Sequence, residues 1–185
     1  MKNFFLIASV LVFSFTSCDI ESLEEDLEDS VENSIEINQT VEEEFSIPQI
    51  TEIGEQEPVE VSIDTQEILD ALSETDQATL ESVSLEDAQI VIPEGIDATF
   101  DFLESLSIVI TSGDFAGTEL ASITEIPEGA TELSLTVTEG APNLVELIES
   151  GDFEIEINYT VDELLAEGLD LEIISDFLVD LGINF

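Results

Sequence analysis

Carboxylates are the main groups in this 185-residue chain that could do chemistry, because it has 46 Asp and Glu but one Lys or Arg and no His. A Ser or Thr nucleophile would have only a carboxylate as its base, which excludes the familiar catalytic triads. A pair of carboxylates could still hydrolyse glycans. No pair stands out among so many acids, and the chain has no Trp and one Tyr, Tyr159, in a core-like position. We therefore expect no enzyme, with a carboxylate-dependent glycan hydrolase as the alternative.

The same oxygens could bind a metal, and calcium is the ion that they suit best, since it takes six to eight oxygen ligands. The twelve-residue calcium loop with a central Gly is not present. Glu125 with Glu128, and Glu149 with Asp152, are acidic turns that solvation explains equally well. Calcium or another divalent cation stays open as a cofactor, and no metal ligand is assigned.

The charge balance limits the classes of partner. The one basic residue, Lys2, lies in the N-terminal leader, so from position 18 onward the chain has no Lys or Arg. Nucleic-acid binding rests on these side chains, and adsorption to anionic lipid head groups does too. Both are excluded for this part of the chain, which leaves cationic partners, metal ions and neutral ligands.

The only cysteine, Cys18, ends the leader. Met1 to Asn3 carry the positive charge, Phe4 to Phe15 are almost all apolar, and Thr16 and Ser17 are small. Twelve helical residues cover roughly 18 Å, less than the roughly 30 Å of a bilayer core. Residues 1–17 are therefore predicted to be a signal peptide.

A small residue before a lone cysteine at the end of an apolar run resembles the lipobox of bacterial lipoproteins. The resemblance implies cleavage before Cys18 and lipid attachment there, with acyl chains such as palmitate as a membrane anchor. An ordinary signal peptide with an incidental cysteine is the alternative. Residues 18–33 are rich in acids and are predicted to be a solvated tether. Acids after the lipidated cysteine resemble lipoprotein sorting signals, which favours the outer membrane or the cell surface over retention at the inner membrane.

From Ser34 the apolar residues follow a period of two, which predicts β-strands over 35–47, 59–63, 83–92, 100–110, 120–126, 133–137 and 153–161. The apolar phase switches at Glu86 and Asp87, which predicts a β-bulge or a bend. Gln39 and Glu43 interrupt the apolar set of the first strand. Odd positions from Leu169 to Phe185 are apolar except Ser175, where we expect a break between two strands.

Short helices are predicted between some of the strands. Asp64 fits an N-cap, Pro142 and Gly151 fit the two ends of a second helix, and residues 162–167 fit one helical turn before Gly168. The whole pattern predicts an antiparallel β-sandwich over residues 34–185, Greek-key or immunoglobulin-like, with two or three short helices. The apolar C-terminal strand ending in Phe185 also resembles the closing strand of outer-membrane barrels, which leaves a small barrel as a further alternative.

These observations predict a lipid-anchored protein of the cell envelope with a single folded domain. Its expected function is that of a non-catalytic binding or structural module with an unknown envelope or extracellular partner, and cations could mediate the contact.

Overall fold

The structure, a computed structural model, describes residues 34–66, 68, 69, 78–151 and 153–183. Contacts divide the chain into two units, Met1–Glu32 and Asn33–Phe185, and every described residue belongs to the second. The leader, the lipidation candidate Cys18 and the whole tether, residues 18–33, lie outside the described residues.

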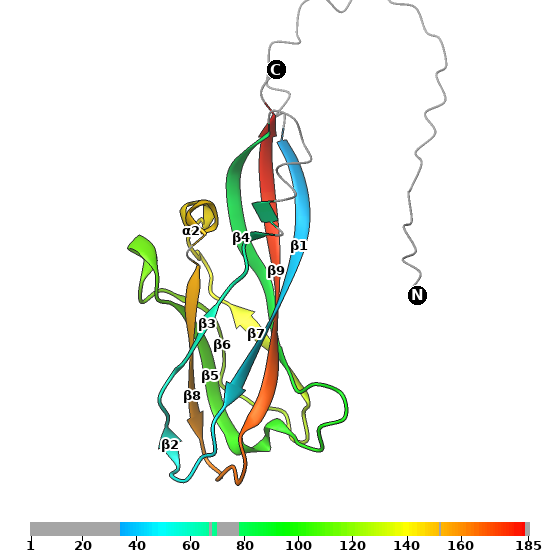
Figure 1. The fold of residues 1–185 in the computed structure, drawn as a ribbon, viewed down its shortest axis with the longest axis vertical. Coiled ribbons are helices and arrows are strands. Elements are labelled where there is room, and N and C mark those ends of the chain that lie inside the picture. Colours follow the sequence, from blue (N-terminus) through cyan, green and yellow to red (C-terminus); the bar gives the residue numbers. More distant parts are fainter. Residues whose placement is uncertain (1–33, 67, 70–77, 152, 184–185) are drawn as a thin grey trace, which may run out of the picture. The chain divides into compact units, whose positions relative to one another are not determined.

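The described residues form a mainly antiparallel β structure, as the alternating pattern predicts (Figure 1). The strands are β1 Ser34–Ile47, β2 Gly54–Glu55, β3 Val59–Ser62, β4 Ala78–Val91, β5 Leu103–Ile110, β6 Glu119–Ile123, β7 Glu132–Val137, β8 Glu154–Val161 and β9 Leu169–Ile183. The α-helix α2, Val145–Ser150, and the 3₁₀ turns η1, Phe100–Phe102, and η2, Gly113–Phe115, lie between strands. The prediction of a mainly β, sandwich-like fold is confirmed.

Two layers of strands face each other. One contains β1, β9, β4 and β7, and the other contains β6, β5, β8, β2 and β3 (Figure 1). The strand β7 belongs to both, because Glu132–Leu135 pairs with β4 whereas Thr136 and Val137 pair with β6. It therefore forms the corner at which one layer continues into the other.

The core lies between the layers and consists of the inward side chains of each strand. In β8, for example, Ile155, Ile157, Tyr159 and Val161 are buried and alternate with more exposed polar residues. The rings of Phe153 and Phe177 meet edge to face at 6.2 Å between centroids and join the two layers. Burial of these apolar faces supplies the main driving force for folding.

Hydroxyl groups satisfy carboxylates on the outer face of β9. Thr40 donates to Asp176 at 2.5 Å, Ser46 donates to Asp170 at 2.7 Å, and Ser82 donates to Asp180. The donors lie on β1 and β4, which flank β9. Neutral donors on neighbouring strands thus take the place of basic side chains, which the described residues do not include.

Two features of β4 and β9 test the expected strand boundaries. The ladder between them shifts between Leu85 and Asp87, so the predicted irregularity at Glu86 is confirmed as a β-bulge. The predicted break near Ser175 is wrong, because β9 runs without interruption through 15 residues. It pairs on both sides with strands of 14 residues, so its length is set by its neighbours.

The structure agrees with the predicted helices only in part. Asp64 accepts a hydrogen bond from the Gln66 N–H at 2.8 Å, as expected of an N-cap, but much of the helix that it would start lies outside the described residues. The second helix begins at Val145, three residues later than expected, and ends at Gly151 in the left-handed conformation. Residues 162–168 are not helical, because Leu165 there pairs with Ile50 as an isolated β-bridge.

Candidate functional site

The strand order has β1 at one end, and both β2 and β3 pair with β8 at the other. Within the described part of the chain, β1 pairs only with β9 and β3 only with β8. Cα atoms of β1 and β3 approach within 8 Å, but the two strands form no backbone ladder. The sandwich therefore has an open seam between these edges.

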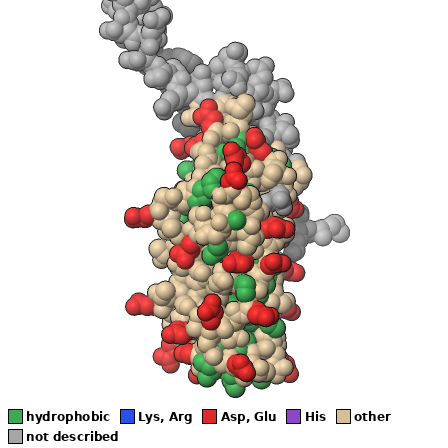
Figure 2. Space-filling view, turned by 90° about the vertical axis from the view of Figure 1, so that its left-hand side faces the viewer, with side chains coloured by type: hydrophobic (Ala, Val, Ile, Leu, Met, Phe, Trp, Pro, Cys, Tyr) green, Lys and Arg blue, Asp and Glu red, His purple; other side chains and the backbone are tan. Residues whose placement is uncertain are grey.

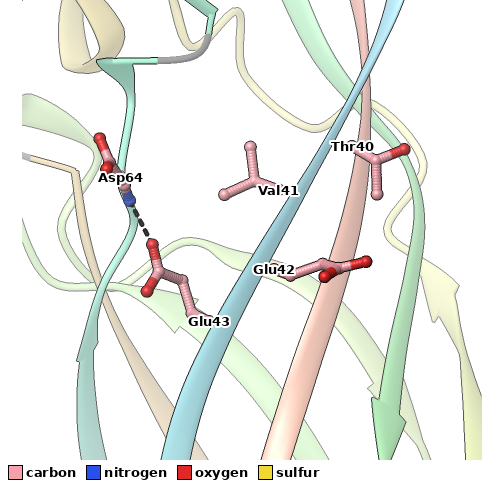
Figure 3. A pocket seen from close by; sticks show the side chains of 5 residues that line it. All are labelled: Thr40, Val41, Glu42, Glu43 and Asp64. Carbon is pink, nitrogen blue, oxygen red and sulfur yellow. Dashed lines mark hydrogen bonds between the residues drawn. The ribbon is translucent and has the colours of Figure 1, made fainter. Parts of the chain in front are cut away.

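A groove of about 480 Å³ lies along this seam. It is lined by Thr40, Val41, Glu42, Glu43 and Asp64 (Figure 3). In the close-up, Val41 and Glu43 extend from β1 toward the side of Asp64, whereas Thr40 and Glu42 extend from the opposite side of the strand. This alternation follows from the two-residue period of a strand.

Glu43 closes part of the seam. Its Oε1 accepts a hydrogen bond from the backbone N–H of Asp64 at 2.7 Å (Figure 3). It has the same parity as the buried Val41 and Phe45, which explains why it interrupts the apolar pattern of β1. A charged side chain that points inward from an edge strand is one way in which proteins prevent unwanted strand pairing. The sequence shows Glu43 at a position where the alternation expects an apolar residue, but the alternation alone did not show that β1 is an edge strand.

The acidic groups of the groove are poorly placed for catalysis or metal binding. Glu42 and Asp64 are exposed, and Glu43 is half-buried and already bonded to a backbone N–H. No group of three Asp, Glu, His or Cys side chains that could hold a metal ion occurs among the described residues. A carboxylate pair for hydrolysis would need one acid sheltered from water and aimed at the other, and the groove does not bring such a pair together.

The metal candidates from the sequence remain apart from the groove. Glu125 and Glu128 are exposed near the loop before β7, and Glu149 is exposed on α2. Asp152, the expected companion of Glu149, lies outside the described residues. The proposed lipid attachment at Cys18 lies outside them as well.

Two titratable groups elsewhere have shifted pKa values. A hydrogen bond from the Gly129 N–H, at 2.6 Å, and a second from Thr99 hold the pKa of Asp101 below its usual 3.8. Burial, and then the charge of Glu57, raise the pKa of Tyr159 above 10. Neither residue lines the groove.

Acidic side chains are spread over the surface rather than confined to the groove. On the face drawn in Figure 2 they extend over the described part of the domain, and no basic side chain interrupts them. No helix in the described part of the chain is long and apolar enough to span a bilayer. No protein-family model and no curated protein matches this sequence.

Proposed function

We propose that this protein is a lipid-anchored module of the cell envelope that binds a partner and has no catalytic role. The anchor is the lipid on Cys18, and residues 19–33 form the tether to the domain that begins with β1 at Ser34. Two or more acyl chains hold a protein stably on a bilayer, so the anchor needs no basic residues to assist it.

The observation that carries the binding role is the outer edge of β1 beside the acidic groove, since no strand in the described part of the chain pairs with this edge. A strand edge with free backbone groups is a surface that recognises another chain, and it needs no reacting group. The carboxylates of the groove supply charge around it. No observation in the described residues favours the glycan hydrolase as a second candidate.

Detergent partitioning tests the anchor. When the chain is expressed in a bacterial host, we expect the wild type in the membrane fraction and in the detergent phase, with a mass that includes the acyl chains. Cys18→Ala should move to the soluble fraction, because it removes the only thiol. Ser17→Ala is the matched control, since it keeps a small residue before the cysteine, and it should partition like the wild type. Retention of Cys18→Ala in the detergent phase would contradict the proposal.

A further inference from the structure

We propose that the free edge of β1 docks an extended segment of a partner protein in which basic and apolar residues alternate. The segment would add to the sheet as a further strand along Ser34–Thr40, with the groove at its end. This inference rests on the proposed function, because it names the kind of partner that the anchored module would bind. Four features of β1 support it: its backbone, its accessible length, its charge and its apolar phase.

The backbone groups of Val83 in β4 point away from β9. The Val83 N–H donates to Asn143 Oδ1 at 3.0 Å, and the Val83 C=O accepts from the Leu144 N–H at 2.9 Å. Both groups of Val83 thus point away from β9, although Val83 stands opposite Val179 in that strand. Because alternate pairs in an antiparallel ladder exchange hydrogen bonds, Val83 and Val179 form a non-bonded pair.

The same alternation fixes the directions in β1. Val179 must direct its N–H and C=O to its other neighbour, which is Ile37 in β1. Ile37 therefore bonds to β9, and the residues on either side of it, Glu36 and Asn38, direct their backbone groups to the free edge. The register between β1 and β9 has no shift, so every even-numbered residue of β1 presents its backbone donor and acceptor outward.

The accessible length of the edge is set by β3. Two strands that flank a third are roughly 9.6 Å apart, twice the strand spacing. The approach of β3 to within 8 Å leaves no room for a strand inside the seam. The contact between Glu43 and Asp64 marks one end of the seam, and β3 extends from Asp64 along the part of β1 that ends at Ile47 (Figures 1 and 3). Ser34–Thr40 lies beyond this contact, and no strand in the described part of the chain pairs with its outer edge, which gives an incoming strand about 23 Å.

The negative charge on the outer face of β1 favours a basic partner. On the outer face of β1, the exposed side chain of Glu36 lies within Ser34–Thr40, and exposed Glu42 follows just beyond it, at the groove. Like charges opposite each other destabilise a strand pair, so a second copy of β1 is a poor occupant. Lys or Arg on the same face of an incoming strand would lie beside Glu36 and diagonal to Glu42, and would form favourable cross-strand pairs.

The odd-numbered apolar side chains of β1 favour apolar residues at the alternate positions of the incoming strand. Ile35 is 42% exposed on this strand, and Ile37 is partly buried against the core. Both are odd-numbered and lie on the face opposite to the acids. An incoming strand with apolar residues between its basic ones would cover Ile35, which has no such cover among the described residues.

The test uses the full chain in neutral detergent and a labelled nine-residue peptide of alternating Lys and Val. We expect binding in fluorescence anisotropy that weakens with added salt. The same peptide N-methylated on alternate residues keeps its charge but loses the edge hydrogen bonds, and it should bind at least about tenfold more weakly. Equal binding of the two peptides would overturn the proposal, since charge alone would then account for it.

Protein variants locate the site. Asn38→Pro removes an outward N–H without removing a ladder bond and should weaken binding at least about tenfold. The triple variant E36Q/E42Q/E44Q should do the same, whereas E94Q/E125Q/E128Q, on exposed loops, should stay within about twofold. Unchanged binding by the β1 triple variant would also overturn the proposal. Loss of peptide binding would leave the Cys18 partitioning result intact, so failures of the two proposals are distinguishable.

Discussion

At the scale of single residues, carboxylates in this protein are held by neutral donors. Asp101 is the clearest example, because it accepts from the Gly129 N–H at 2.6 Å and from the Thr99 hydroxyl at 2.8 Å. These bonds favour the charged form of the Asp101 carboxyl and therefore lower the pKa of Asp101. They also connect the start of η1 with the turn before β7.

Replacement of Asp101 by Asn tests this contribution. A lowered pKa in the folded state means that Asp101 stabilises the fold above its ordinary pKa of 3.8 and that this stabilisation is lost as the pH falls through the lower folded value. The melting temperature of Asp101→Asn should therefore lie below that of the wild type at pH 6, and the gap should shrink from pH 4 to pH 2. Thermal melts by circular dichroism measure it. A gap that is constant over this range would contradict the prediction.

At the scale of elements, Asn143 fastens α2 to β4. Its Oδ1 accepts from the N–H groups of Val83 and Val145, and its Nδ2 donates to the Glu81 C=O at 3.1 Å. The residue thus binds the side of β4 where β7 no longer pairs, and it also accepts from Val145, the first residue of α2. Pro142 in the sequence predicted the helix, but no local pattern indicates this role of Asn143, because it depends on which strand lies alongside.

Removal of the Asn143 side chain should loosen both elements. Asn143→Ala leaves the Val83 N–H without its acceptor, and Val83 is fully buried. We expect a loss of about 1–3 kcal/mol in the free energy of unfolding, measured by urea denaturation. Asn143→Asp keeps an acceptor oxygen but not the donor to Glu81, so it should lose less. Equal losses in the two variants would show that the acceptor is not what matters.

Local patterns predicted part of this architecture. The phase switch at Glu86 revealed the bulge because each side chain reports its own face of the strand. The length of β9 was missed, because its continuity through Ser175 depends on β1 and β4 pairing on both sides. The free edge of β1 was missed for the same reason, since strand order is a long-range property. Only the inward Glu43 gave a local sign of it.

At the scale of the whole molecule, the charge is unbalanced. Acids stand directly opposite each other across strands, as Glu44 opposite Glu172 and Asp87 opposite Asp176. The described residues include no Lys, Arg or His to offset them. Hydroxyl donors satisfy individual oxygens but do not neutralise the net charge, so the folded state carries a large self-repulsion.

Salt should therefore stabilise this domain. In most proteins added salt screens both attractions and repulsions, but here the described side chains offer only repulsions to screen. The melting temperature should rise steadily between 10 and 500 mM sodium chloride at pH 7, by several degrees. The same titration at pH 4, near the ordinary pKa of carboxyl groups, is the control and should show a smaller rise. A melting temperature that is flat or falls with salt at pH 7 would contradict this.

The full pairing of β1 with β9 has a mechanical consequence. Ser34, which follows the predicted tether in the sequence, stands opposite Gly182, and Ile47 stands opposite Leu169. When the domain is held at Leu169 in β9, tension applied at Ser34 along β1 acts parallel to the strands and perpendicular to their hydrogen bonds. The ladder is then loaded in shear, and its bonds share the force instead of opening one after another. A strand docked on the outer edge would pass its load to the tether along β1, with little passing through the core.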